Sequence, residues 1–180
     1  MIQRSLLLLL LPVMIHAQSV PPSADAVMKE AYQQASAQKK NVFLIFHASW
    51  CGWCHRMDSS MSDESCKKFF NDNYVIRHLT VDESKDKKNL ENPGANEFRK
   101  KYGGDGLGIP YWLVFDPEGK LLADSRFRED GNVNSKPGDN SGCPATEKEV
   151  AYFIQVLKQT SKLSAADEAI IARRFRMNGN

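Results

Sequence analysis

The pattern of apolar and polar residues predicts four β-strands with helical segments around them. Residues 42–47 (VFLIFH) form a continuous apolar run of β-branched and aromatic side chains between polar boundaries, which is typical of a buried central strand. The sequences YVIRHLTVD at 74–82 and YWLVF at 111–115 predict two more strands. A turn sequence, DPEG at 116–119, leads from the third strand into an antiparallel fourth strand at 120–124.

Helical patterns occupy the segments between and after these strands. Ser23 is a candidate N-cap for the first helix, and Thr146 with Glu149 forms a capping-box motif at the start of another. We expect helices at residues 23–39, 51–60, 63–71, 95–102, 146–160 and 164–176.

The order of these elements predicts the fold class α/β. We expect a four-stranded mixed sheet flanked by helices on both faces, with extra N- and C-terminal helices. The apolar strand at 42–47 should be central, parallel to the strand at 74–81, with the hairpin at 111–124 antiparallel beside it.

The composition is that of an ordinary globular protein. With 180 residues, of which 42% are hydrophobic, the chain has the length of one domain and enough apolar side chains for a packed core. Its 24 basic and 22 acidic residues give a formal charge of +2, which provides no electrostatic footprint for nucleic acid. The four cysteines are too few to build a disulfide-stapled miniprotein.

Residues 1–17 have the features of a secretory signal peptide. Arg4 gives a short positive region, residues 6–15 form an apolar stretch, and Ala17 is a small residue suited to cleavage. The alternative is a buried N-terminal helix. On the first interpretation, residues 18–180 form a single domain that is periplasmic or secreted and does not span the membrane after cleavage near Ala17.

The candidate chemistry lies in the sequence SWCGWCH at 49–55, where the central strand ends and a helix begins. Cys51 is placed at the helix N-terminus, where free N–H groups and the helix dipole favour a thiolate. Cys54 lies further along the helix and should be shielded. The two thiols therefore suit an exposed nucleophile and a buried resolving cysteine, joined by a readily exchanged disulfide.

A second motif, GIP at 108–110, stands immediately before the strand at 111–115. A proline that starts a strand after an extended residue is a candidate cis-proline. Such a bend would leave the backbone of Ile109 beside the thiols, able to pair with an extended peptide.

These two motifs resemble those of the thioredoxin superfamily, in its exported bacterial branch. VFLIFHASWCGWCHRM is similar to the strand–dithiol–helix unit of that family, and GIPYWLVFDPEGK to its cis-proline hairpin. The chain is also similar to the C-terminal domain of the bacterial transmembrane thiol transporter. The resemblance covers roughly residues 39–158 and implies a thioredoxin-like fold.

The resemblance also implies roles for individual residues. Cys51 would be the attacking cysteine, Cys54 the resolving cysteine, and Pro110 the cis-proline that shapes the substrate groove. The implied function is an exported thiol–disulfide oxidoreductase that needs no cofactor, because the Cys51–Cys54 pair carries the electrons. Its partners would be disulfide- or thiol-bearing client proteins and a membrane thiol carrier that donates electrons.

The chain departs from the family pattern around the dithiol. Ile45 stands where thioredoxins have a buried Asp, and His78 matches the position of a nearby Lys. His55 and His78 are therefore candidates for a proton relay. We expect Trp50 to pack over Cys54.

The candidate substrate-binding residues are Trp50, Trp53, Ile109 and Pro110. Trp53 should be exposed to substrate, beside Ile109 and Pro110. The long polar loop at 128–144 should border the same groove.

Other interpretations of the cysteines remain open. Residues 51–55 also match the C-x-x-C-H haem-attachment pattern, and a second interpretation of the fold is a client-binding module with little turnover. No cysteine and histidine spacing matches a zinc site, so no metal is expected. Cys66 and Cys143 are either buried thiols or a structural disulfide.

The direction of the reaction is expected to be reduction. An apolar residue, Ile109, precedes Pro110, as in the reducing members of the family by resemblance. No His lies between the two cysteines to stabilise the thiolate, and a stabilised thiolate is what makes such a pair a strong oxidant.

Overall fold

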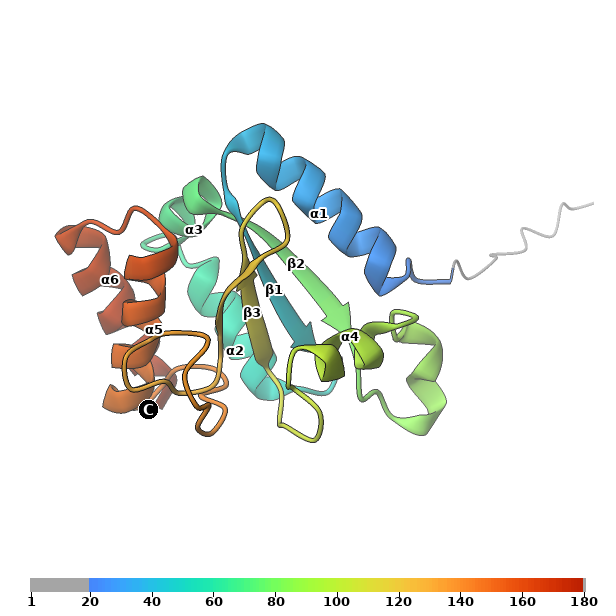
Figure 1. Cartoon of the computed structure of the whole chain (residues 1–180). Coiled ribbons are helices and arrows are strands. Elements are labelled where there is room, and N and C mark those ends of the chain that lie inside the picture. The colour runs from blue at the N-terminus through green and yellow to red at the C-terminus, as the bar shows by residue number, and fades with distance from the viewer. Residues whose placement is uncertain (1–19, 180) are drawn as a thin grey trace, which may run out of the picture.

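A computed structural model describes residues 20–179 of the chain (Figure 1). The predicted signal peptide at 1–17 lies outside the described residues. In chain order the elements are α1 (Ala24–Gln38), β1 (Asn41–His47), α2 (Gly52–Met61), α3 (Lys67–Asn73), β2 (Tyr74–Thr80), η1 (Lys85–Leu90), α4 (Ala95–Lys101), β3 (Tyr111–Phe115), β4 (Leu121–Asp124), α5 (Glu147–Thr160), α6 (Ala165–Arg176) and η2 (Met177–Gly179). Within this part of the chain, none of the helices has the length and apolar character needed to cross a membrane.

The four strands form one mixed sheet in the order β2-β1-β3-β4. β1 runs parallel to β2 and antiparallel to β3, and β3 pairs antiparallel with β4. The predicted fold class and the central position of β1 are therefore confirmed. Because β1 has a neighbour on each side, its backbone groups are paired along both edges.

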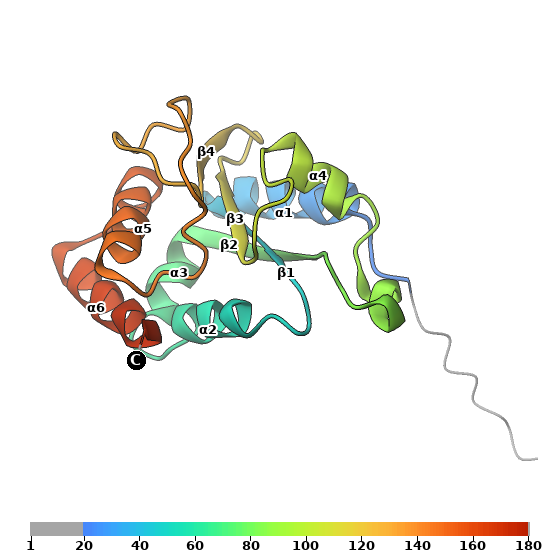
Figure 2. The ribbon, with the colours of Figure 1, turned by 90° about the horizontal axis from the view of Figure 1, so that it is seen from below.

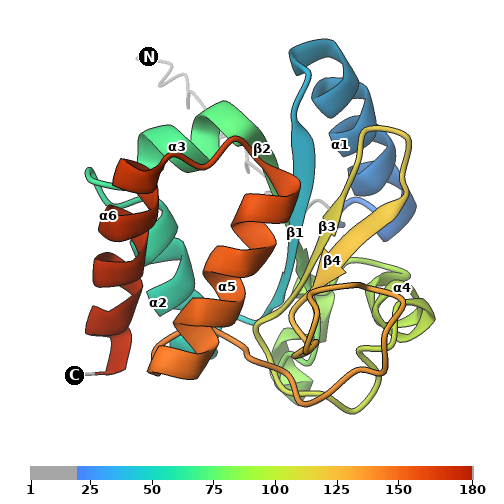
Figure 3. The ribbon, with the colours of Figure 1, turned by 60° about the vertical axis from the view of Figure 1, so that its left-hand side comes forward.

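Helices cover both faces of the sheet. Figures 2 and 3 show α1 and α4 on one face and α2, α3, α5 and α6 on the other. Side chains of β1 alternate between the two resulting cores: Phe43 belongs to the core beneath α2 and α5, whereas Leu44 belongs to the core beneath α1. Tyr111 and Trp112 of β3 divide in the same way, and both are fully buried.

Local sequence signals set most helix ends. The Ser23 side chain accepts a hydrogen bond from the Ala26 N–H at the start of α1, and Thr146 and Glu149 form the predicted capping box of α5. The helix expected at 63–71 instead begins at Lys67. The Asp63 side chain accepts hydrogen bonds from the Ser65 N–H and hydroxyl. These bonds stabilise a turn, so the helix begins only after it.

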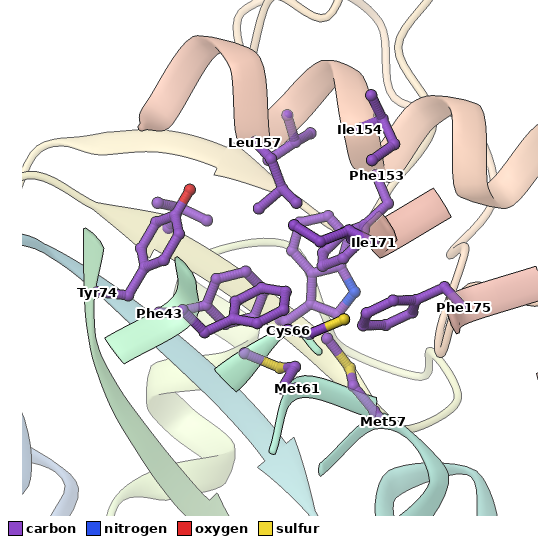
Figure 4. Close-up of a cluster of buried hydrophobic side chains, with 14 of the residues drawn as sticks. Phe43, Met57, Met61, Cys66, Tyr74, Phe153, Ile154, Leu157, Ile171 and Phe175 are labelled. Atoms are coloured by element: carbon purple, nitrogen blue, oxygen red, sulfur yellow. The ribbon is translucent and has the colours of Figure 1, made fainter. Parts of the chain in front are cut away.

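The core beneath α2 and α5 is aromatic (Figure 4). Phe153 of α5 lies at its centre, with ring centroids 5.6 Å from Trp112 and 4.8 Å from Phe175. Phe43 and Phe70 lie 6.2 and 6.3 Å from the same ring. This cluster joins the two C-terminal helices to the sheet that carries the cysteines.

We expect Phe153→Ala to lower the free energy of unfolding by about 3–5 kcal/mol, because it leaves a cavity among four aromatic rings. The measurement is urea unfolding followed by circular dichroism. Leu90→Ala, which truncates an exposed apolar side chain, is the control and should change stability by no more than about 0.5 kcal/mol. Equal effects of the two substitutions would contradict this packing.

Candidate active site

Cys51 and Cys54 form a disulfide at the start of α2, with an S–S distance of 2.05 Å. Cys51 is the N-cap residue, with extended backbone (φ −79°, ψ 94°), and its sulfur accepts a hydrogen bond from the Cys54 N–H at 3.1 Å. Cys54 is fully buried. Cys51 is only 3% exposed in this oxidised state, less than expected for the nucleophile, because Ala48 and Ile109 pack against the pair.

The backbone before β3 lies directly beside the disulfide. The Ile109–Pro110 peptide bond is cis, and the Ile109 carbonyl oxygen lies 3.6 Å from the Cys51 sulfur. The structure thus brings together Cys51, Cys54, Ile109 and Pro110, which are far apart in the sequence.

The far end of the long polar loop holds this segment in place. The Asn140 side-chain amide donates to the carbonyl oxygens of Gly108 at 2.8 Å and Pro110 at 3.2 Å. The Trp112 indole donates to the Gly142 carbonyl oxygen at 2.9 Å. The loop at 128–144 therefore borders the segment that faces the disulfide.

The two tryptophans beside the cysteines are both solvent-exposed. Trp53 is 47% exposed, as expected, and the Arg56 guanidinium lies 4.6 Å from the centroid of its ring. Trp50 is 59% exposed, so the expectation that it packs over Cys54 is wrong. Its indole N–H donates to the Asp82 carbonyl oxygen at 2.8 Å, which holds the ring at the surface.

The loop that carries Cys51 is anchored to the loop after β2 by Glu83, a residue that the sequence analysis missed. Its carboxylate accepts hydrogen bonds from the Ser49 N–H at 2.5 Å and the Ser49 hydroxyl at 2.8 Å. Nothing in the local sequence distinguishes Glu83 from the other acidic residues of that loop, because its partner lies 34 positions earlier.

The histidines near the site contact polar groups other than the sulfurs. His55 Nε2 lies 3.0 Å from the Ser49 carbonyl oxygen, and His78 Nε2 lies 2.8 Å from Asp58 Oδ1. His47 packs its ring 4.8 Å from that of His78. Burial, followed by the neighbouring His78, lowers the pKa of His47.

Cys66 and Cys143 are both free thiols, so the structural disulfide considered for them is not formed. Both belong to the aromatic core, and Figure 4 shows the Cys66 sulfur among Met57, Met61 and Phe175. Burial raises the pKa of both thiols, that of Cys143 to about 12. Each therefore behaves as a small apolar side chain.

Comparison with known proteins places this arrangement in a family. The sequence model of the thioredoxin-like family matches residues 24–117, more than half of the chain. The chain belongs to this thioredoxin-like family.

Individual relatives are more distant. The Uncharacterized protein B0495.5 of Caenorhabditis elegans is 37% identical over 59 residues, which are 32% of this chain. The matched region spans only 8% of that relative's length.

Several solved structures are similar in fold. A disulphide isomerase from Xylella fastidiosa Temecula1 is 24% identical, with a TM-score of 0.47, over 65% of this chain and 80% of the other. A structure described as DsbH Oxidoreductase is 21% identical, with a TM-score of 0.44, over 86% and 95%. A mutant thioredoxin from Halobacterium salinarum NRC-1 is 14% identical, with a TM-score of 0.43, over 81% and 93%.

The cysteine assignment predicts a specific thiol count. Unreduced protein, once denatured, should show two thiols per chain with Ellman's reagent, and reduced protein should show four. Native unreduced protein should resist iodoacetamide, because both free thiols are buried and protonated. Absence of any thiol after denaturation would mean that Cys66 and Cys143 are paired.

Proposed function

We propose that this protein is an exported thiol–disulfide oxidoreductase that reduces disulfides in client proteins. The observation that carries the proposal is the Cys51–Cys54 disulfide at the N-terminus of α2, with the Ile109 carbonyl oxygen 3.6 Å from the Cys51 sulfur. A sulfur at a helix N-terminus is where a thiolate is stabilised, and an adjoining backbone segment provides a place for an extended client.

The reaction begins from the reduced pair. The Cys51 thiolate attacks one sulfur of a client disulfide, forms a mixed disulfide, and expels the other client sulfur as a thiolate. Cys54 then loses its proton and attacks the Cys51 sulfur, which breaks the mixed disulfide and releases the second client thiolate. Two electrons pass from the dithiol to the client, the client thiolates take up two protons, and the protein is left as the Cys51–Cys54 disulfide described above.

As the proton acceptor for Cys54 we favour His78 together with Asp58. Asp58 follows Cys54 by four residues on α2, so the two side chains occupy the same helix face one turn apart. His55, whose Nε2 contacts the Ser49 carbonyl oxygen, is the second candidate.

Client recognition would use the surface around the disulfide. Trp50 and Trp53 flank the cysteines and expose large aromatic surfaces, and Ile109 and Pro110 form the adjoining wall. The signal-peptide features of residues 1–17 support a periplasmic or secreted location, and a membrane thiol carrier would then return electrons to the pair. No cofactor is needed, because the two sulfurs carry both electrons.

The two alternative functions, haem attachment and client binding without turnover, would use the cysteines differently. Haem attachment uses both sulfurs of a C-x-x-C-H motif, whereas here these sulfurs are bonded to each other. A client-binding module with little turnover would keep the same surface, and it is distinguished from an enzyme only by catalysis.

Substitution of each cysteine separates the two steps of the mechanism. We expect Cys51→Ser to abolish insulin reduction, because it removes the nucleophile. Cys54→Ser should form the mixed disulfide but fail to resolve it, so it should accumulate covalent complexes with clients that reducing gels release. Cys66→Ala is the matched control and should keep the activity. Turnover that survives in Cys51→Ser, or a Cys54→Ser variant that traps nothing, would contradict this mechanism.

The direction of electron flow is tested by the reduction potential. A reductase should have a potential nearer to that of thioredoxin, about −270 mV, than to that of a strong oxidant, about −120 mV. Equilibration with glutathione, followed by Trp fluorescence, gives the value. A potential above about −170 mV would favour an oxidase instead.

A further inference from the structure

Glu83 has a buried carboxylate that is hydrogen-bonded to the turn at residues 48–51, here called the dithiol loop. It lies three residues beyond the end of β2 and is only 4% exposed. Both of its oxygens accept hydrogen bonds from Ser49, which precedes Cys51 by two residues. Two peptide units therefore separate the residue that binds this carboxylate from the attacking cysteine.

The charge of Glu83 has no cationic partner. Its neighbours Asp82 and Glu91 are paired with Arg99 and Lys88. Among residues 20–179, by contrast, no Lys, Arg or His nitrogen lies within 4.0 Å of the Glu83 carboxylate. A buried charge without a counter-ion acts on its surroundings with little screening.

The segment that carries Glu83 is firmly held. Arg99 donates two hydrogen bonds to the Asp82 carboxylate, at 2.6 and 3.2 Å. The Glu83 N–H donates to Glu91 Oε1 at 2.7 Å, and the Trp50 indole donates to the Asp82 carbonyl oxygen. Together with the two hydrogen bonds from Ser49 to Glu83, the Trp50 contact joins the two loops by three hydrogen bonds. The carboxylate therefore cannot readily turn away from Ser49.

The geometry points to Glu83 as the positioning residue that makes the dithiol a reductant: its buried charge, held against Ser49, disfavours the Cys51 thiolate. This inference rests on the proposed oxidoreductase function. The Cys51 thiolate is part of the reduced pair, so a charge that raises the free energy of the thiolate makes the reduced pair less stable. A less stable reduced pair gives up its electrons more readily. The helix N-terminus, which favours the thiolate, is opposed by this carboxylate.

The range of the effect is consistent with the chain geometry. Two peptide units place the carboxylate on the order of 10 Å from the Cys51 sulfur, where one buried charge changes a pKa by about one pH unit. The same charge also reaches the end of β1: burial lowers the pKa of His47, and Glu83 opposes that shift. Other ionisable groups around the α2 N-terminus and the end of β1 are His47, His55, Arg56, Asp58 and His78.

The test is Glu83→Gln, which removes the charge and keeps the shape. The glutamine oxygen can still accept from the Ser49 N–H, and its amide can donate to the Ser49 hydroxyl. Glu97→Gln, at an exposed position of α4, is the control that removes the same charge elsewhere. Circular dichroism checks that each variant is folded.

Two readouts are measured. The first is the equilibrium in which the protein disulfide and two molecules of reduced glutathione give the protein dithiol and oxidised glutathione. The second is the thiolate absorbance of reduced protein as a function of pH. We expect Glu83→Gln to raise the equilibrium constant by about three- to tenfold and to lower the Cys51 pKa by about 0.5 to 1 unit, whereas Glu97→Gln leaves both unchanged.

A further variant separates charge from hydrogen bonding. Glu83→Asp keeps the charge but draws it back from Ser49, so the equilibrium constant should stay within about twofold of the wild-type value and the Cys51 pKa within about 0.3 unit of it. If Glu83→Asp shifts them as far as Glu83→Gln does, or if Glu83→Gln changes only the melting temperature, the inference is wrong.

Failure of the proposed function has a different signature. In that case the wild-type pair would not exchange with glutathione and would not reduce insulin. The thiolate titration of chemically reduced protein still tests Glu83, because it does not depend on turnover.

Discussion

Burial of β1 on both faces is the constraint that positions the site. Residues 42–46 are all fully buried, and alternate side chains enter the two cores on either side of the sheet. A shift of the β1 register by one residue would move each side chain to the opposite face of the sheet, where it would not fit the core. The register of β1 is therefore strongly specified. The carboxyl end of β1 is fixed as a result, and with it the turn from Ala48 to Cys51, which is closed by a 3.0 Å backbone hydrogen bond.

Beyond the carboxyl end of β1, the loops around the disulfide are held by hydrogen bonds. Ser49 is bound by Glu83, and Asn140 binds the carbonyl oxygens on both sides of Ile109. Loops must satisfy their backbone groups without a strand partner, and here they do so through one another's side chains. The disulfide therefore lies between two segments, each of which is fastened by residues distant in the sequence.

Most of what could be predicted from the sequence was local, and the non-local contact between the GIP motif and the thiols is the exception. The apolar run at 42–47, the Thr146 capping box and the two-cysteine motif each carry their signal within a few residues, and each was placed correctly. The surroundings of the motif depend on distant partners. Trp50 is held at the surface by the Asp82 backbone, a contact that no spacing in the sequence encodes. The start of α3 was missed because a side chain of Asp63 outweighed helix propensity.

Ile45 occupies an apolar position on the central strand. Its side chain belongs to the same core as Met57 and Trp112, where a carboxylate would be surrounded by apolar atoms and costly to bury. His78 pairs with Ile45 in the register of β1 and β2, yet its ring contacts Asp58 on α2. The acid–base groups near this end of the sheet lie on β2, on α2 and in the loop after β2. There, hydrogen-bond donors are available to hold a charge, as the Ser49 N–H and hydroxyl do for Glu83.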